Sequence, residues 1–314
     1  MPVHAFIFPG QGSQAPGMGH DLAAAFSAAR EVFQEVDDTL GQKLSAIMFE
    51  GPPETLTLTE NAQPALMAHS LAVLRVLETE GGFKLADRAV VVAGHSLGEY
   101  SALAAAGAFG IGQVARLLKL RGQSMQKAVP PGTGSMAALL GAEMPLALEI
   151  CAEAAEGEVI EPGNDNGGGQ VVISGATAAV ERAIVIAQAK GVRRAMKLPV
   201  SAPFHCAMMA PAAEVMAEAL RASPPVSPMV PLVANVSAAR TMDPAEIVDL
   251  LVKQVTATVR WRECMLTMAS LGVDSFVELG SGKVLSGLVK RIAPDATGAN
   301  AGTPAEIEAL LKLL

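Results

Sequence analysis

The sequence predicts an α/β fold with a mainly parallel sheet and a smaller inserted subdomain. Short apolar runs of the kind found in buried strands alternate with helical stretches in both terminal parts of the chain. The composition is aliphatic, with 51% hydrophobic but only 4% aromatic residues. In the middle of the chain, the order of expected elements changes to β-α-β-β-α-β. Alternating strands and helices are typical of a parallel sheet with helices on its faces.

The composition excludes several classes of protein. The 314 residues are enough for about two domains. A net charge of −8 provides no basic field for nucleic acid. The apolar runs are shorter than the roughly 20 residues of a membrane span, and no signal peptide is apparent at the N-terminus. Three widely spaced cysteines without a Cys-x-x-Cys pair predict a reduced, cytoplasmic chain with no metal site.

The first part of the chain predicts two strands followed by helices. The apolar segment 3–8 ends at Pro9-Gly10, and the apolar segment 88–93 ends at a glycine-rich turn. Uninterrupted apolar runs of this length are typical of buried parallel strands. Expected helices lie over 21–38, 64–80 and 99–106, and in the segment after Phe109.

The middle of the chain predicts a ferredoxin-like unit, which has the order β-α-β-β-α-β. Its expected elements are a strand over 135–140, a helix over 145–155, strands over 158–161 and 170–174 around a glycine-rich turn at 163–169, a helix over 177–190 and a strand over 192–198. We therefore expect an inserted subdomain at 130–198 and a catalytic core formed by 1–129 and 199–314. The core resumes with helices near 206–221, 243–254, 260–271, 284–292 and 304–313, and with strands at 231–234 and 275–279.

Residues 94–98 form the motif Gly-His-Ser-Leu-Gly, which matches Gly-x-Ser-x-Gly. The motif follows an expected strand and precedes an expected helix, which is the context of a nucleophile elbow in an α/β-hydrolase-like core. The tight turn exposes the hydroxyl of Ser96 beside the N-terminus of the helix. Ser96 is therefore the predicted nucleophile, and the alternative is a serine that only caps the helix.

A serine nucleophile needs a base. Of the five histidines, His205 lies in a loop before a helix, where site residues collect. No aspartate between Ser96 and His205 suits a triad, because Asp165 falls in the expected turn of the subdomain. The sequence therefore predicts a Ser-His dyad in which a backbone carbonyl orients His205. The alternative is that His205 only caps the helix.

The loop Phe8–Gln14 is the predicted second contributor to an oxyanion hole. The backbone N–H of Leu97, directly after the nucleophile, supplies one donor, and we expect the N–H of Gln11 to supply the other. Gly10, Gly12 and Ala15 also fit a dinucleotide fingerprint. Pro16-Gly17 interrupts the helix which that reading needs.

Arg121 falls within the apolar stripe of its expected helix, together with Val114, Leu118 and Met125. An unpaired buried charge is very costly, so a core-facing arginine needs a partner. Its planar fork suits a carboxylate, which makes Arg121 a candidate for binding a substrate carboxylate near Ser96. A structural ion pair and a side chain that extends to the surface are the alternatives.

Together these residues resemble the malonyl-CoA:acyl carrier protein transacylases and the related acyltransferase domains of polyketide synthases. The resemblance covers nearly the whole chain. Its motifs are Phe-Pro-Gly-Gln-Gly-Ser-Gln at 8–14, Gly-His-Ser-Leu-Gly-Glu-Tyr at 94–100, Arg121 to Met125, Asn164-Asp165-Asn166, Pro199 to Cys206, Gln254 with Val259-Arg260-Trp261, and Glu278 to Leu285.

The resemblance implies a function and a set of roles. Ser96 takes a malonyl group from malonyl-CoA, with His205 as base and then acid, and passes it to the phosphopantetheine thiol of acyl carrier protein. Gln11 and Leu97 form the oxyanion hole, Arg121 pairs with the malonyl carboxylate, and the Gln254 carbonyl orients His205. The roles that it implies for the remaining residues are substrate binding for Met125 and Phe204, and CoA or carrier binding for Asn166. Phe204 should crowd an α-methyl group.

Partners follow from this reading. We expect malonyl-CoA as substrate, acyl carrier protein as partner, no tightly bound cofactor, no nucleic acid, no membrane, and a monomer. An acidic carrier needs a local basic patch on this acidic chain, and its densest basic cluster is Lys190, Arg193, Arg194 and Lys197. Of these, we expect Arg193 and Arg194 to meet the CoA phosphates or the carrier near the mouth of the site. A solvated basic face is the alternative. A serine hydrolase is the rival function, although it needs a triad acid.

Overall fold

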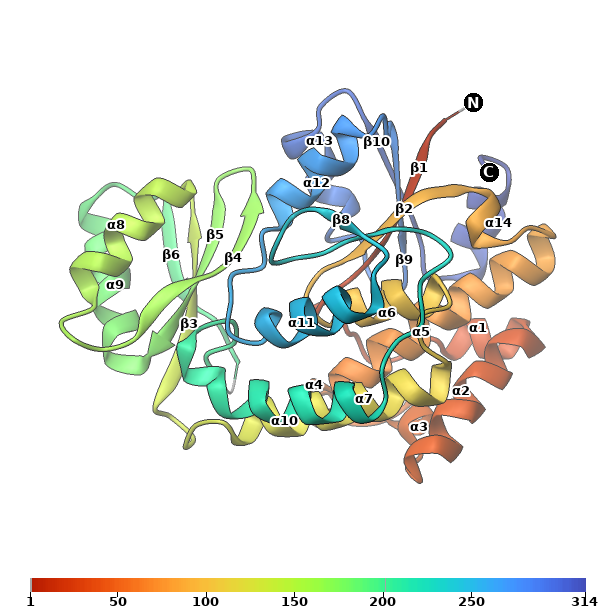
Figure 1. Cartoon of the computed structure of the whole chain (residues 1–314), viewed down its shortest axis with the longest axis horizontal. Coiled ribbons are helices and arrows are strands. Elements are labelled where there is room, and N and C mark those ends of the chain that lie inside the picture. The colour runs from red at the N-terminus through yellow and green to blue at the C-terminus, as the bar shows by residue number, and fades with distance from the viewer. Residues whose placement is uncertain (1, 201) are drawn as a thin grey trace.

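The computed structural model of the chain describes residues 2–200 and 202–314. It contains two sheets (Figure 1). The larger sheet has the strand order β10-β9-β1-β2-β7-β8, and all its neighbouring strands are parallel except β7 and β8. This confirms the mainly parallel sheet. Its strands are β1 (His4–Phe8), β2 (Ala89–Gly94), β7 (Leu232–Val233), β8 (Arg240–Thr241), β9 (Ser275–Leu279) and β10 (Thr297–Ala301).

Helices cover both faces of the larger sheet, because its strands alternate between two cores. In β1, Phe6 and Phe8 face one apolar cluster, whereas Ala5 and Ile7 face another. The helices of the first cluster are α1 (His20–Ala25), α2 (Ser27–Leu40), α3 (Leu44–Phe49), α4 (Pro53–Thr57), α5 (Thr59–Gly81), α6 (Leu97–Ala105), α7 (Ile111–Lys127), α10 (Ala210–Ala222), α11 (Pro244–Gln254) and α14 (Pro304–Leu311). Those of the second are α12 (Trp261–Ser270) and α13 (Val289–Ile292). The 3₁₀ turns are Leu85–Asp87, Ala207–Met209 and Ser286–Leu288.

The smaller sheet is antiparallel, with the strand order β4-β5-β3-β6. Its elements follow in the order β3 (Gly134–Leu140), α8 (Met144–Ala154), β4 (Ile160–Gly167), β5 (Gln170–Ala176), α9 (Thr177–Ala189) and β6 (Arg194–Lys197). They lie together at one end of the molecule (Figure 1). A separate apolar cluster, which includes Leu139, Ile150 and Ile173, fills the space between this sheet and its two helices.

Backbone bonds join the smaller sheet to the rest of the chain beside the site described below. Val259 donates its N–H to the Gly163 carbonyl at 2.9 Å and accepts from the Asp165 N–H at 2.9 Å. The Asp165 carboxylate is buried and pairs with Arg262 of α12 at 2.9 Å. The segment expected as a turn at 163–169 is therefore mostly strand, because β4 continues to Gly167.

Several other sequence predictions were wrong in detail. The helix expected over 21–38 is two helices, because the backbone is extended at Phe26. The helix expected over 64–80 begins five residues earlier, with Pro64 inside it. Only a 3₁₀ turn and the four residues of α13 form within 284–292. The edge strands β8 and β10 and the short helices α3 and α4 were not predicted. Short elements of this kind have too few residues to show a period.

Candidate active site

The elbow lies at the carboxyl end of β2, where the chain turns into α6. Ser96 has a φ of 53° and a ψ of −111°, a strained conformation for a residue other than glycine. A Cβ at Gly94 would overlap the backbone of Gly98, and one at Gly98 would overlap the Phe8 carbonyl. Neighbouring backbone therefore lies too close to either glycine of the motif to leave room for a side chain. The two glycines place Ser96 at the start of α6, above the central strands β1 and β2.

Ser96 and His205 form a hydrogen-bonded pair, with Ser96 Oγ 2.8 Å from His205 Nε2. On the other side of the ring, His205 Nδ1 lies 2.7 Å from the backbone carbonyl of Gln254. Because a carbonyl can only accept, the ring carries its proton on Nδ1 and offers the Nε2 lone pair to the serine hydroxyl. His205 also has a positive φ, of 61°. Both residues keep strained backbone conformations because the surrounding structure holds them there.

The environment keeps His205 neutral. Burial lowers the pKa of His205 to about 3, and the nearby Arg121 charge adds to this effect, whereas the Gln254 carbonyl opposes it. A histidine with so low a pKa is unprotonated at neutral pH. His205 is thus in the state that a general base needs.

The loop after β1 packs directly against the elbow. A Cβ at Gly10 would lie 2.8 Å from the His95 carbonyl, and the His95 N–H donates to the Phe8 carbonyl at 3.0 Å. Within the described residues, the backbone N–H groups of Gln11 and Leu97 have no acceptor. Both residues line the same cavity as Ser96. The arrangement is that of two free donors beside a nucleophile.

Arg121 is only 1% exposed and points at the nucleophile. Its Nη2 lies 3.2 Å from Ser96 Oγ and 2.9 Å from Oε1 of Gln254, and its Nη1 lies 2.9 Å from Oε1 of Gln63. Its guanidinium carbon lies 5.6 Å from the centre of the Tyr100 ring. No carboxylate of the described residues lies within ion-pair distance of Arg121. Among the described residues, Arg121 therefore forms no structural ion pair, and its side chain does not extend to the surface. Neither of the two alternatives for Arg121 holds.

A cavity of about 540 Å³ opens over the pair, and Arg121 forms part of its wall. Met125, Phe204 and Asn166 also line it. Asn166 Oδ1 lies 2.9 Å from Nε2 of His95, which ties the elbow to β4 of the smaller sheet. From the motif Pro199–Cys206, the wall also includes Pro199, Val200 and His205, and Ser201 lies outside the described residues.

Two polar residues of the site were missed in the sequence. Gln63 holds Arg121, as described above, and its Nε2 lies 3.7 Å from the sulfur of Met125. Asn235 accepts from the Ser96 N–H at 2.8 Å and donates to the Gly94 carbonyl at 2.8 Å. Asn235 carried a signal, because it directly follows an expected strand, whereas Gln63 directly precedes the helix expected over 64–80 and carried none.

Arg193 and Arg194 do not line the cavity. Both are exposed, and Arg194 lies two strands away from the cavity-lining Gln170, because it pairs with Leu140 and Leu140 pairs with Gln170. Two other members of this basic cluster are neutralised: Lys190 pairs with Glu149 and Glu153, and Lys197 with Glu181.

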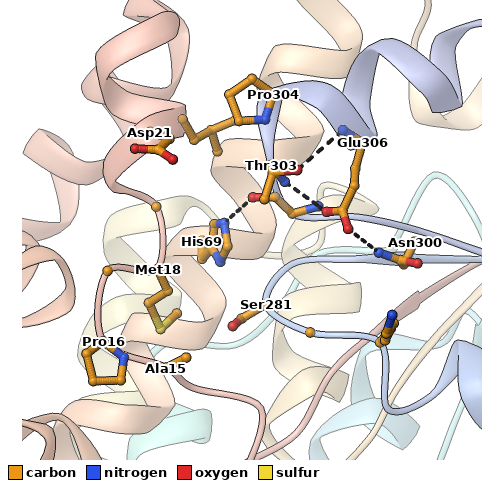
Figure 2. A pocket seen from close by; sticks show the side chains of 16 residues that line it. Ala15, Pro16, Met18, Asp21, His69, Ser281, Asn300, Thr303, Pro304 and Glu306 are labelled. Carbon is orange, nitrogen blue, oxygen red and sulfur yellow. Dashed lines mark hydrogen bonds between the residues drawn. The ribbon is translucent and has the colours of Figure 1, made fainter.

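A second cavity, of about 350 Å³, is lined by the segment 15–19 and by residues of the C-terminal part such as Ser281 and Thr303 (Figure 2). It contains none of the predicted site residues. His69 of α5 is buried in its wall and lies 2.9 Å from the Gly302 carbonyl through Nε2. Glu306 bonds with Asn300 and Thr303 in the same view. Burial lowers the pKa of His69 to about 4.

This histidine gives a testable pH dependence of stability. The unfolded chain protonates His69 near pH 6.5, but the folded chain does so only near pH 4. The unfolded state thus gains protons first, so the free energy of unfolding falls by about 2.5 kcal/mol from this group between pH 7.5 and 4.5. In urea unfolding at both values, H69Q should lose less stability on acidification than the wild type by about this amount.

The exposed residue His20 provides the matched control for the loss of a histidine side chain at the surface, in the variant H20Q. His95 and His205 are also buried with lowered pKa values, so only the difference between variant and wild type is informative. Equal acid destabilisation of H69Q and the wild type would contradict the prediction.

No group of three or more His, Cys, Asp or Glu side chains in 2–200 and 202–314 could hold a metal ion. No helix in that part of the chain is both long and apolar enough to cross a membrane.

Comparison with known proteins identifies the family. The acyl transferase domain family matches residues 5–301. The malonyl CoA-acyl carrier protein transacylase of Escherichia coli strain K12 is 44% identical over 313 residues, which cover 100% of this chain and 100% of that protein. An acyl-carrier-protein S-malonyltransferase structure from Bartonella henselae has a TM-score of 0.97 and 55% identity, and the match covers 99% of both chains. A malonyl-transacylase solved in complex with a type II PKS acyl-carrier protein has a TM-score of 0.96 and 42% identity, covering 99% of this chain and 100% of that one. The chain therefore belongs to the acyl transferase domain family.

Proposed function

We propose that this chain transfers the malonyl group of malonyl-CoA to the phosphopantetheine thiol of acyl carrier protein, supplying malonyl units for fatty-acid synthesis. The observation that carries the proposal is Arg121: a buried guanidinium with no ion pair to any described residue, 3.2 Å from the hydroxyl of Ser96. A buried cation at that place favours an acyl group that ends in a carboxylate. The names of the relatives agree with this substrate.

In the first half-reaction, Ser96 Oγ attacks the thioester carbonyl while its proton passes to Nε2 of His205. The Oγ–C bond forms, and the negative charge on the carbonyl oxygen is stabilised by the N–H groups of Gln11 and Leu97. The C–S bond then breaks, and the sulfur takes the proton from His205. CoA leaves, and a malonyl ester remains on Ser96, as in other ping-pong acyl transfers.

The second half-reaction runs the same steps in reverse with the carrier thiol. His205 takes the thiol proton, the sulfur attacks the ester, and the proton returns to Ser96. The Gln254 carbonyl keeps His205 oriented through Nδ1 in both halves. Arg121 holds the malonyl carboxylate away from the reacting carbon, and Met125, Phe204 and Asn166 shape the cavity.

We also propose a domain organisation, a cellular location and an oligomeric state for the protein. An α/β-hydrolase-like core, 1–129 and 199–314, carries the dyad, and a ferredoxin-like subdomain, 130–198, covers the cavity. The chemistry uses side chains and backbone only, so it calls for no tightly bound cofactor. We place the protein in the cytoplasm as a monomer, in keeping with its three free, buried cysteines. Arg193 and Arg194, exposed and outside the cavity, meet the acidic carrier rather than the acyl group.

The decisive experiment is incubation with malonyl-CoA in the presence and absence of holo-acyl carrier protein. We expect malonyl-carrier and free CoA in equal amounts, and a malonyl-enzyme when the carrier is omitted. Release of free malonate at the same rate with and without the carrier would instead support the rival function, a serine hydrolase.

Phe204 is expected to exclude an α-methyl group from the cavity. It is buried in the cavity wall one residue before His205. A single methyl group in an apolar pocket changes binding by about 1–3 kcal/mol. F204A should therefore raise the ratio of methylmalonyl to malonyl transfer by about 10-fold or more in a competition assay. F83A, at a distant half-buried phenylalanine, is the control, and an unchanged ratio in F204A would contradict the prediction.

A further inference from the structure

Glu99 is a buried carboxylate in the first turn of α6, directly beneath the elbow. It is 1% exposed. Its Oε2 accepts from the backbone N–H of Asn235 at 2.8 Å and from Nε2 of Gln254 at 3.1 Å. Its Oε1 has no hydrogen-bond partner in the described residues. The mechanism above does not use Glu99, yet a carboxylate buried at this depth needs a reason.

The side-chain amide of Gln254 connects Glu99 to Arg121. Its Oε1 accepts from Nη2 of Arg121 at 2.9 Å, and its Nε2 donates to Glu99. The carbonyl end of the amide dipole thus faces the cation, and the N–H end faces the anion. The same Nε2 lies 3.0 Å from the Ser96 carbonyl, and the backbone carbonyl of the same residue holds His205. One residue therefore joins the nucleophile, the base, the cation and the carboxylate.

Arg121 is the one charged group that faces Glu99 within the described residues. Tyr100, beside Glu99 on α6, has its pKa raised by burial to about 12. Cys264 of α12 has its pKa raised well above the usual range, and His205 across Gln254 has its pKa lowered to about 3. All three are neutral near pH 8, where Glu99 is ionised. Glu99 and Arg121 thus form a buried pair of opposite charges, separated by one amide.

We propose that Glu99 is the resident counter-charge of Arg121, acting through the Gln254 amide, and that it takes up a proton when a carboxylate-bearing acyl group pairs with Arg121. This rests on the proposed function. Without substrate, the buried site holds one positive and one negative charge. A malonyl carboxylate adds a second negative charge, and an excess charge in a buried site is costly. Protonation of Glu99 restores neutrality, as for two carboxylates that share one site.

The pKa of Glu99 is suited to this uptake of a proton. Burial raises the pKa of Glu99 to about 7, against the stabilising effects of Asn235, Gln254 and Arg121. Near pH 8 the carboxyl is therefore mostly ionised in the free protein. A second carboxylate on Arg121 weakens the attraction that favours the ionised form, so the pKa rises further and a proton is taken from solvent.

The proton balance of acyl loading tests the proposal. Loading forms the Ser96 ester, breaks the thioester and gives the hydroxyl proton to the CoA thiol. The extra proton on Glu99 comes from the medium. We expect the wild-type protein at pH 8 to take up close to one more proton per malonyl ester than per acetyl ester, because acetyl has no carboxylate. A pH-indicator dye measures the protons, and mass spectrometry counts the esters.

The variant E99Q is the matched comparison, because glutamine has the shape of protonated glutamate and does not titrate. Its malonyl and acetyl esters should show equal proton uptake. In the wild type, we expect the KM for malonyl-CoA to rise several-fold between pH 7 and 9. In E99Q, the KM for malonyl-CoA should not change with pH over this range. The KM for acetyl-CoA should not change with pH in either protein. A residue with only a structural role would change rates without changing this proton count.

Three results would overturn the inference. Equal proton uptake per malonyl ester and per acetyl ester in the wild type would show that no group takes up an extra proton. This comparison does not depend on a variant. Excess uptake that persists in E99Q would place the proton on another group, such as His205. If the wild type forms no malonyl ester, the proposed function itself fails, whereas a normal ester yield without excess uptake overturns only the role of Glu99.

Discussion

Replacing Ser96 by alanine is expected to abolish the malonyl-enzyme and to lower malonyl transfer by about 10⁴-fold or more. The hydroxyl lies 2.8 Å from His205 Nε2, and the strained turn leaves no other nucleophile in its place. The donors of Gln11 and Leu97 remain in the variant, so any residual rate reports what polarisation alone contributes. Single-turnover labelling with radioactive malonyl-CoA, followed by intact-protein mass spectrometry, measures both effects.

Ser101 offers a matched control on the same helix. It is as buried as a core residue, and its hydroxyl has no hydrogen-bond partner in the described residues. S101A should keep full labelling, because its hydroxyl lies outside the cavity. Stoichiometric malonylation of S96A at the wild-type rate would mean that another residue is the nucleophile.

Replacing Arg121 by alanine is expected to remove the preference for malonyl, with the ratio of malonyl to acetyl transfer falling by about 100-fold. Loss of one partner of a buried, hydrogen-bonded charge pair costs about 2–5 kcal/mol. The ratio is the informative quantity, because the variant also removes a bond to Ser96 Oγ and takes Arg121 away from Oε1 of Gln63 and Oε1 of Gln254. Acetyl transfer experiences these losses too, and so serves as an internal reference.

Two further variants of α7 sharpen this test. R121K keeps the charge but loses the planar fork, so its ratio should fall between those of the wild type and R121A. R116A changes an exposed arginine of the same helix and should leave the ratio as it is. An unchanged malonyl-to-acetyl ratio in R121A would refute carboxylate binding by Arg121.

The long elements of the fold were predictable because their patterns depend on local sequence. The apolar run that forms β2 and the stripe of α7 each reflect a face that must be buried. The break at Phe26 and the extension of β4 to Gly167 were not predictable, because neighbouring segments decide them. In β4, pairing with β5 and the bridge to Val259 override the tendency of a glycine-rich segment to turn.

In the candidate site, too, some residues were predictable from local sequence and others were not. Ser96 was identified from its motif, and Arg121 from its position on an apolar stripe. The roles of Gln63 and Asn235 depend on contacts across 58 and 139 residues of chain. A single sequence carries no record of contacts over such separations. Arg193 and Arg194 were chosen because they are near His205 in sequence, and in the structure neither lines the cavity.

The sequence by itself determined the elbow, its strand and helix, and the direction in which Arg121 points. These follow from steric limits on a tight turn and from the cost of burying an unpaired charge, both of which act within a few residues. Only the tertiary structure showed that the Gln254 carbonyl lies 2.7 Å from His205 Nδ1, that the Gln254 amide connects Arg121 to Glu99, and that the first loop reaches the elbow. Those contacts join segments brought together by the packing of the parallel sheet, so the physical cause lies in the whole core rather than in any one motif.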